Sequence, residues 1–420
     1  MGSGGALRRA LSHRDSRIFF GGSMLAWTGL WMQRIAVSWL AWELTGSAFW
    51  VGMVAFCDLA PAVIASPLAG AVADRMDRVK LATLAQFAIA VQAAVVAGIT
   101  ASGHMTIGIL LGLEVVGGIA ASFAQPVRQA LMPGIVPRAD LPAAVAANSL
   151  TFAVARFVGP ALAGPIIAIW GVVPAIAANA IGYSLAALSI LLLKVAAADR
   201  QGHPAGASLW GEVAEGIRYA QRHAGIGPLL LYAALAAILL RGVQEILPPF
   251  VERSFGRGAD ALAMLTACFG IGSLIAGLWV ANRGRLAGTT RLAVWAALAM
   301  AATTGAFAAT NWFPLGLLCG ALIGATASVH GISVQTLLQN ATEAAFRGRV
   351  LSLWGLITRA CPAIGALALG AAGEAFGLRI PTLVAVGLFL GVLAWGVSRL
   401  ARMERALEGP PPSGGAKGTA

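Results

Sequence analysis

Ionisable side chains interrupt several long apolar stretches of this 420-residue chain. A charged residue at the centre of a membrane-spanning helix costs about 2.5–3.5 kcal/mol on insertion scales. Each such residue therefore requires an ionic partner, a water-filled cavity or a function in moving protons or ligands. The residues concerned are Arg34, Asp58, Glu114, Arg156, Arg241, Glu245, His330 and Arg359.

Asp58 and Glu114 are the carboxylates that we predict to carry protons. A carboxyl group in a partly dry cavity favours its protonated form, and it can exchange that proton as its access to water changes. The alternative is a permanent intramembrane ion pair, in which Asp58 or Glu114 neutralises Arg34. The sequence alone gives the two interpretations equal weight.

Other residues of the set also allow two interpretations. Arg241 and Glu245 are four residues apart, so on an α-helix they could pair with each other. His330 could carry a proton or could be a hydrogen-bonded structural histidine. Trp27, Trp31 and Arg34 share one helix face, which could stack on an aromatic anion or could simply fill a contact between helices.

The elements that hold these residues are predicted from composition. Hydrophobic residues make up 58% of the chain and charged residues only 11%, against about 25% charged in a typical soluble protein, so a membrane must be the solvent. Twelve apolar segments have the length of a transmembrane helix: 17–43, 47–70, 79–101, 105–127, 141–168, 174–194, 225–248, 260–281, 289–310, 314–337, 350–372 and 380–400.

The basic residues predict the orientation. A net charge of +12 would suggest a nucleic-acid partner in a soluble chain, but most of the 29 Lys and Arg residues fall in loops on one side of the spans, Arg128 among them. The opposite loops hold only Arg253, Arg257 and Arg379. Basic loops stay in the cytoplasm, so both termini are expected inside a bacterial cytoplasmic (inner) membrane, with no nucleic-acid partner.

Enzymatic and metal chemistry lack their usual residue patterns. The four cysteines form no Cys-x-x-Cys pair, so neither a disulfide framework nor a metal site is expected. The chain has no Gly-x-Ser-x-Gly, His-Glu-x-x-His or Walker sequence, which argues against a hydrolase, a zinc protease or an ATPase. An ion gradient is therefore the expected energy source, and no cofactor is expected.

The two halves of the chain contain matching segments at an offset of 203 to 209 residues. Six spans therefore occur twice in the same orientation, which predicts a bundle at 1–195 and a second bundle at 225–405. Residues 196–224 form a polar linker whose Leu209, Val213 and Ile217 spacing predicts a surface helix at the cytoplasmic interface. Residues 406–420 are expected to be a disordered cytoplasmic tail. Two such bundles suit transport by alternating access.

Residues 70–80, GAVADRMDRVK, lie between the second and third predicted spans. They resemble the signature loop of the major facilitator superfamily, which has Gly, small residues, Asp-Arg, then Gly-Arg and a basic residue. Asp77 stands where that pattern has its second Gly. The resemblance implies that Gly70, Asp74, Arg75 and Arg78 act as a latch of the outward-facing state.

Further segments resemble the enterobactin-exporter-like branch of bacterial efflux transporters in this superfamily: residues 125–133, 136–141, 148–149, 156–164, 215–219 and 347–350. Gly159 and Pro160 also match part of a Gly-Pro motif of antiporters in the superfamily, which implies export. Arg156 and Arg359 occupy matching positions in the two halves, which predicts structural roles near a cytoplasmic gate.

The resemblance implies an all-α membrane protein of twelve transmembrane helices in two pseudo-symmetric six-helix bundles. In this superfamily the first, fourth, seventh and tenth spans line the central cavity, so Arg34, Glu114, Arg241, Glu245 and His330 are expected to face it. The expected function is proton-coupled export of a siderophore or a drug-like molecule by a monomer in contact with membrane lipid. A multidrug or lysophospholipid transporter is the alternative within the fold, and a membrane scaffold or enzyme is a more distant one.

Overall fold

The computed structural model describes residues 12–65, 72, 76–137, 140–195, 209–283, 286–343 and 346–409. Within these ranges the regular structure is helical. Gly70, Asp74 and Arg75 of the predicted latch lie outside the described residues, as do the first part of the linker and the end of the C-terminal tail.

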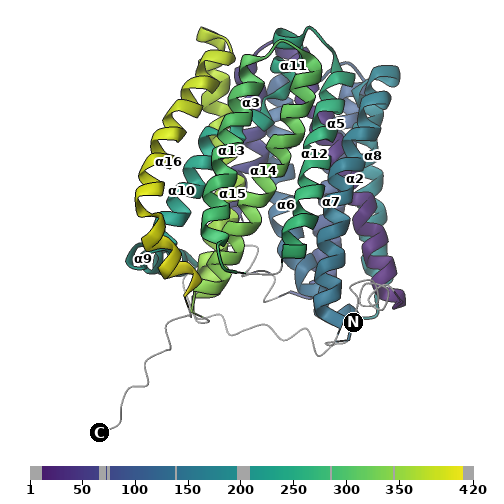
Figure 1. The fold of residues 1–420 in the computed structure, drawn as a ribbon. Coiled ribbons are helices and arrows are strands. Elements are labelled where there is room, and N and C mark those ends of the chain that lie inside the picture. The colour runs from purple at the N-terminus through teal and green to yellow at the C-terminus, as the bar shows by residue number, and fades with distance from the viewer. Residues whose placement is uncertain are drawn as a thin grey trace. The chain divides into compact units, whose positions relative to one another are not determined.

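A helix or a broken helix occupies each of the twelve predicted spans (Figure 1). The first six correspond to α2 (Arg14–Thr45), α3 (Ala48–Leu59), α5 (Arg78–Ala101), α6 (Ile107–Ile135), α7 (Leu141–Trp170) and α8 (Val172–Leu191). The linker contains α9 (Leu209–Arg222). The later spans correspond to α10 (Ile226–Leu239) with η3 (Arg241–Glu245) and α11 (Leu247–Phe255), then α12 (Ala259–Arg283), α13 (Thr289–Ala309), α14 (Phe313–Ala341), α15 (Arg347–Phe376) and α16 (Arg379–Glu408).

Length and apolarity support a membrane protein with many spans. Among the described residues nine helices are long and apolar enough to cross a membrane, or up to eleven if each of two bent helix pairs counts as one span. Helix α2 is not among the nine, because Gln33 and Arg34 interrupt the apolar sequence at its middle. The first span therefore has a polar centre.

The seventh predicted span, 225–248, is not one continuous α-helix. It consists of α10, the 3-10 helix η3 and α11. Gly242 in η3 lies against the backbone of Gly365, and a Cβ there would be 2.6 Å from the Gly365 carbonyl carbon. Arg241 and Glu245 lie in this 3-10 turn, which has three residues per turn, so the α-helical pairing considered for them does not apply.

Helix α6 continues beyond the predicted end of the fourth span at residue 127 and reaches Ile135. Pro126 and Arg128 suggest a span boundary in the sequence, but both lie inside the helix. The assignment of Arg128 to a loop is wrong, because this side chain is only 4% exposed. A proline is tolerated in a membrane helix when neighbouring helices satisfy the freed backbone groups.

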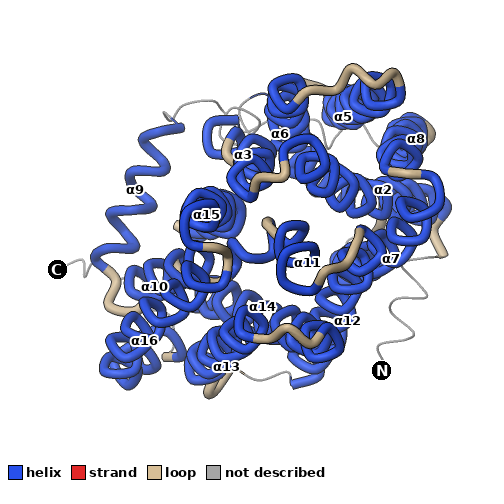
Figure 2. Tube along the Cα trace, turned by 90° about the horizontal axis from the view of Figure 1, so that it is seen from above, coloured by secondary structure: helices blue, strands red, loops and turns tan. Residues whose placement is uncertain are grey.

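The chain divides into two compact units: Met1–Gly206 with Leu247–Gly270, and Ala207–Ile246 with Ile271–Ala420. In the first unit α2 packs along α7 and α8, and α5 packs along α6 and α8 (Figure 2). In the second unit α10 packs along α15 and α16, and α13 packs along α14 and α16. The second unit thus repeats the neighbour pattern of the first.

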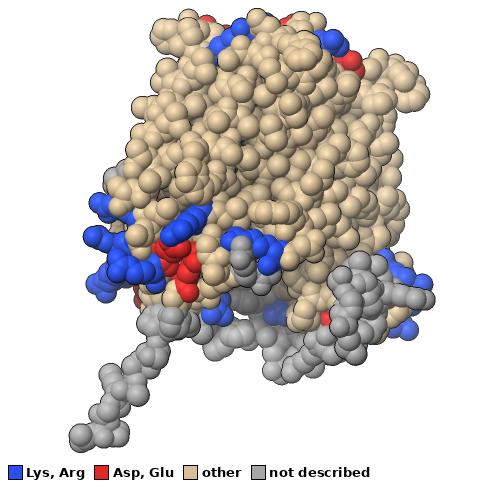
Figure 3. All heavy atoms as spheres, in the orientation of Figure 1, with Lys and Arg blue, Asp and Glu red and all other residues tan. Residues whose placement is uncertain are grey.

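Charged side chains gather at the ends of the helices in the view of Figure 3, and the visible flank between them consists of other residue types among those described. Exposed apolar side chains such as Val91, Ile181 and Leu390 lie near the middle of their helices. A wide apolar flank with charged ends is the surface expected of a protein surrounded by lipid.

Candidate functional site

The site begins at Trp31 on α2, where two arginines approach the same indole ring. The guanidinium carbons of Arg34 and Arg156 lie 5.4 and 5.2 Å from the ring centroid. Phe152 on α7 meets the ring edge-on, with 6.1 Å between centroids. The buried indole N–H of Trp31 has no hydrogen-bond acceptor among the described residues. Two cations and a donor therefore converge at this point of the first unit.

Gly159 and Pro160 bring α7 close enough to α2 to build this cluster. A Cβ at Gly159 would lie 2.5 Å from the Trp31 Cβ and 2.8 Å from the Thr28 carbonyl oxygen. Pro160 follows inside the helix and is buried. The predicted Gly-Pro motif therefore contacts the backbone of α2 beside Trp31, where a small residue is required for close packing.

Trp27 lies one turn earlier and is enclosed by protein. Its side chain is 4% exposed, the Arg128 guanidinium lies 3.8 Å from its ring centroid, and Phe152 meets it edge-on at 5.1 Å. Arg128 also donates hydrogen bonds to Ser23 at 2.8 Å and to Gln125 at 3.2 Å. These neighbours favour the interpretation that Trp27 fills a contact between helices over the interpretation that it stacks on a ligand.

Asp58 pairs with Arg34. The Arg34 Nη2 to Asp58 Oδ2 distance is 3.2 Å, and each side chain is 29% exposed. Of the two carboxylates proposed as partners of Arg34, the structure thus selects Asp58. Because the pair is partly accessible, a ligand anion could compete for the guanidinium.

Gly118 explains how α3 reaches α6 near Asp58. A Cβ at Gly118 would overlap the carbonyl oxygen of Asp58, so only glycine permits this backbone contact. Glu114 lies one turn before Gly118 on the same helix, and both are buried.

Glu114 ends a row of buried amides that crosses four helices of the first unit. Gln92 on α5 donates to Glu114 Oε1 at 3.3 Å and also to the Leu113 carbonyl at 3.2 Å. Gln33 on α2 donates to Gln92 at 3.5 Å, and Asn179 on α8 donates to Gln33 at 2.6 Å. Among the described residues Glu114 has no ionic partner within 4.0 Å. It is a buried carboxyl group, 7% exposed, held by a neutral donor.

The predicted site residues of the second unit lie on different elements. Arg241 and Glu245 are half-buried in η3, and no ion pair joins them to each other among the described residues. Arg359 is half-buried on α15. His330 on α14 is 4% exposed, places Nδ1 3.0 Å from the Ala293 carbonyl oxygen, and packs edge-on against Tyr232. These contacts are those of a hydrogen-bonded structural histidine.

The sequence search missed a cluster where α2 ends. The Trp42 indole N–H donates to the Glu252 carboxylate of α11. Arg253 lies over the Trp42 ring at 4.8 Å and donates to the Gly46 carbonyl oxygen at 2.7 Å. Both contacts lie within the first unit, because α11 belongs to it. The only sequence signal for this cluster was the pair of basic residues in a predicted outer loop.

Asp77, the departure from the signature loop, caps α5. Its carboxylate accepts from the backbone N–H groups of Val79 at 2.9 Å and Lys80 at 3.4 Å. Arg78 follows as the first helical residue and is half-buried. An aspartate at this position satisfies helix N–H groups that glycine would leave to water.

A family model described as a transmembrane secretion effector matches residues 9–411 of the chain. The chain belongs to the transmembrane secretion effector family of the major facilitator superfamily. The resemblance inferred from the sequence is thus confirmed. The chain is a multi-pass membrane transporter, not an enzyme, and it belongs among small-molecule efflux proteins.

Curated relatives match most of the chain. It is 24% identical over 364 residues to a staphyloferrin A transporter of Staphylococcus aureus, which covers 86% of this chain and 90% of the relative. It is 27% identical over 399 residues to an enterobactin exporter of Citrobacter koseri, with 90% and 86% covered. It is 21% identical over 334 residues to macrolide efflux protein A of Streptococcus pyogenes, with 79% and 82% covered.

Solved structures confirm the predicted fold class. A bacterial homologue of the human lysosomal transporter Spinster matches with a TM-score of 0.71 at 15% identity, over 96% of this chain and 99% of that chain. A nucleoside transporter matches with a TM-score of 0.69 at 13% identity, over 90% and 99%. At these identities the likeness concerns the fold alone.

Proposed function

We propose that this protein exports a small organic anion of the siderophore type by alternating access, in exchange for protons. The observation that carries the proposal is Glu114, a buried carboxyl group with an amide donor and no ionic partner among the described residues. Relatives named as siderophore transporters support the substrate class, and relatives named as macrolide and multidrug pumps make a drug the second candidate.

Glu114 is suited to gain and lose a proton without rebuilding its surroundings. The Gln92 amide can donate to the carboxyl oxygen in either protonation state, since it carries no charge of its own. Burial disfavours the charged form until water or a cation reaches the group. A conformational change that alters this access would therefore alter proton occupancy, as antiport requires.

The Arg34–Asp58 pair would link the proton to the substrate. A carboxylate or catecholate of the substrate could accept from Arg34 and so replace Asp58 as its partner. Asp58 would then be free to take a proton. Arg156 and the aromatic ring of Trp31 lie beside Arg34, which favours an anionic ligand with a planar group.

Several further features of the transporter remain proposals. The bacterial cytoplasmic membrane with both termini inside is supported by the distribution of Lys and Arg. Two six-helix halves and a monomeric transporter are what we expect for alternating access. The latch assigned to the signature loop, including Arg78, and the gating roles of Arg156 and Arg359 likewise rest on the family resemblance.

Export from inverted membrane vesicles tests the coupling. The full chain would be loaded into vesicles, and uptake of a carboxylate siderophore and of a macrolide would be measured in parallel with and without an imposed pH gradient. Antiport predicts uptake that rises with the gradient and falls when a protonophore collapses it. Uptake that is equal under all three conditions would contradict proton coupling.

Growth measurements separate the two substrate classes. A strain that lacks the gene is expected to grow poorly in iron-limited medium and to recover when the wild-type chain is supplied. If iron limitation has no effect and macrolide sensitivity rises instead, the siderophore proposal is wrong and the drug proposal stands.

A further inference from the structure

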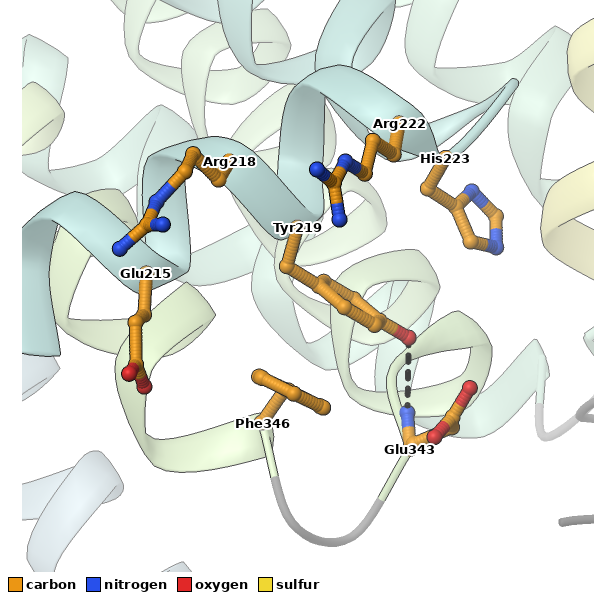
Figure 4. Close-up of a pocket in the computed structure, with 7 residues that line it drawn as sticks. All are labelled: Glu215, Arg218, Tyr219, Arg222, His223, Glu343 and Phe346. Atoms are coloured by element: carbon orange, nitrogen blue, oxygen red, sulfur yellow. Dashed lines mark hydrogen bonds between the residues drawn. The ribbon is translucent and has the colours of Figure 1, made fainter.

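A polar cavity lies in the second unit between α9 and the facing residues that directly follow α14 and directly precede α15 (Figure 4). Its volume is about 390 Å³, within the range of about 300–1,000 Å³ found for ligand sites. Helix α9 contributes Arg218 and Arg222, and the facing segment contributes Glu343 and Phe346. None of these residues takes part in the proposed transport chemistry.

Helix α9 lies across the direction of the neighbouring span. The axis of Ala214–Arg222 is bent by 111° from that of Ile226–Leu239 in α10, and Figure 2 shows α9 lengthwise where α10 is seen end-on. Ile217 on α9 is 42% exposed, whereas Ala220 is buried in the unit. If α10 crosses the membrane, α9 runs along its surface on the predicted cytoplasmic side.

One side of the cavity supplies donors for an anion. Arg218 and Arg222 are one turn apart on α9 and both are exposed. His223 accepts from the backbone N–H groups of Gly225 and Ile226 through Nδ1, each at 3.2 Å. Burial lowers the pKa of His223, so the ring stays neutral and carries its proton on Nε2, which points away from the two arginines in Figure 4.

The other side supplies a place for a cation. Among the described residues the Glu343 side chain has no hydrogen bond or ion pair, whereas Glu215 pairs with Arg349 at 3.0 Å. Tyr219 and Phe346 stack with 4.5 Å between centroids and 12° between planes. The Tyr219 hydroxyl accepts from the Glu343 backbone N–H at 3.3 Å, which fixes the two together. The Arg349 guanidinium already lies over the Phe346 ring, 5.3 Å from its centroid, so the Glu343 carboxylate is the suitable site for an ammonium group.

We propose that this cavity binds the headgroup of a zwitterionic phospholipid from the cytoplasmic leaflet. The phosphate would accept from Arg218 and Arg222, and the ammonium group would lie beside the Glu343 carboxylate. A lipid is favoured over a soluble phosphoester because α9 runs along the membrane surface if α10 crosses the membrane, and because Ile217 on α9 is an exposed apolar side chain. The inference concerns binding alone, so it does not depend on the proposed transport cycle.

Lipid binding to the purified full chain tests this site. Native mass spectrometry would measure affinity for dihexanoyl-phosphatidylethanolamine, dihexanoyl-phosphatidylglycerol and soluble glycerophosphoethanolamine. The wild type should bind the ethanolamine lipid about tenfold more tightly than the glycerol lipid, since each charge-assisted contact is worth at least about a factor of ten. It should also bind the ethanolamine lipid more tightly than glycerophosphoethanolamine, which has the same charged groups but no acyl chains to bury. Arg222→Gln should weaken both lipids about tenfold.

Glu343→Gln provides the decisive variant. It should weaken the ethanolamine lipid about tenfold while leaving the glycerol lipid unchanged or tighter, because only the ammonium contact is lost. Arg402→Gln, an exposed arginine of α16 outside the cavity, is the matched control and should bind as the wild type does. Thermal unfolding checks that all variants are folded.

Two results would overturn the proposal. If Arg222→Gln and Glu343→Gln bind both lipids like the control, the cavity is not the lipid site. If glycerophosphoethanolamine binds as tightly as the ethanolamine lipid, the cavity recognises a soluble phosphoester instead. Should one variant unfold, Arg218→Gln tests the phosphate contact independently, since Arg218 is exposed on α9.

Discussion

The two units repeat the same helix neighbours around interiors of different polarity. In the first unit Asn179, Gln33, Gln92 and Glu114 form a hydrogen-bonded row across α8, α2, α5 and α6. The row has only one ionisable member, and that member is buried at its end. Polar side chains therefore form the central contacts between the helices of the first unit.

The second unit has apolar side chains at the matching positions. Adding the offset of 207 to 209 residues to Gln33, Gln92 and Glu114 gives Leu240, Met300 and Ile323, all of which are buried. Two of them, Leu240 and Met300, belong to one hydrophobic cluster with Tyr232. Buried polar groups are harder to accommodate than apolar ones, so a duplicated fold retains them where they have a use. Under the proposed antiport, this difference favours the first unit as the place of proton transfer.

Replacement of Glu114 is expected to have the largest effect. Glu114→Gln keeps the shape and one acceptor for Gln92 but removes the proton-carrying carboxyl group. Gradient-driven export from inverted vesicles should fall on the order of 100-fold, the scale of losing a group that transfers protons. Exchange of substrate without a gradient should persist, because the variant keeps its binding residues.

The matched change in the second unit is Ile323→Val. It should lower the free energy of unfolding by about 0.5–1.5 kcal/mol and leave gradient-driven export intact. If Glu114→Gln exports like the wild type, or if Ile323→Val abolishes coupling, the assignment of proton chemistry to the first unit is wrong.

Gly118→Ala is expected to have the next largest effect. Its Cβ would overlap the Asp58 carbonyl oxygen, so α3 and α6 must separate near both carboxylates. The free energy of unfolding should fall toward the upper end of the about 1–3 kcal/mol typical of overpacking, and export should be lost. Thermal unfolding and vesicle uptake measure the two effects.

Gly112→Ala is the control on the same helix. No atom lies within 4 Å of its added Cβ, so the alanine should stabilise α6 by up to about 1 kcal/mol. Equal behaviour of the two variants would show that the α3–α6 contact does not need glycine.

A reciprocal pair of substitutions tests the polarity of the two interiors directly. Gln92→Met removes the donor to Glu114, and Met300→Gln places an amide in the apolar cluster of the second unit. Each should lower the free energy of unfolding by about 1–3 kcal/mol, because each leaves a buried polar group without a partner. Denaturation of the two variants in detergent gives the comparison. If Met300→Gln is as stable as the wild type, the second interior is not as dry as its apolar packing indicates.

The lengths of the apolar stretches predicted where the helices lie better than they predicted where a helix is broken. The spans follow from apolar stretches, but the 3-10 turn at 241–245 arises where Gly242 packs on Gly365, a tertiary contact that no local pattern encodes. Arg128 was assigned to a loop because the fourth span was predicted to end at residue 127, whereas its burial depends on Ser23 and other distant partners.

Asp58 and Glu114 both interrupt apolar sequence, and the sequence does not indicate which of them pairs with Arg34. That choice depends on how α2, α3 and α6 meet, and Gly118 decides the contact of α3 with α6. The neutral amides of Gln33 and Gln92 were not predicted as site residues, because they carry no charge. Both stand within apolar sequence, which is a signal that could have identified them.

The smallest expected effect concerns a titrating group at the edge of the second unit, in contrast to the interior of the first. Neutral His223 accepts from the N–H groups that begin α10, and its protonated ring could not. Burial lowers the pKa of His223, while Glu343 opposes this to a lesser degree. As the pH falls below about 6.5, the unfolded chain binds a proton that the folded chain does not, so the free energy of unfolding decreases by at most about 1.4 kcal/mol per pH unit.

His223→Asn keeps an acceptor for the helix N-terminus and removes the titration. Thermal unfolding at pH 7.5 and 5.5 should therefore show a smaller loss of stability for the variant than for the wild type, and equal losses would mean that His223 is not the group responsible.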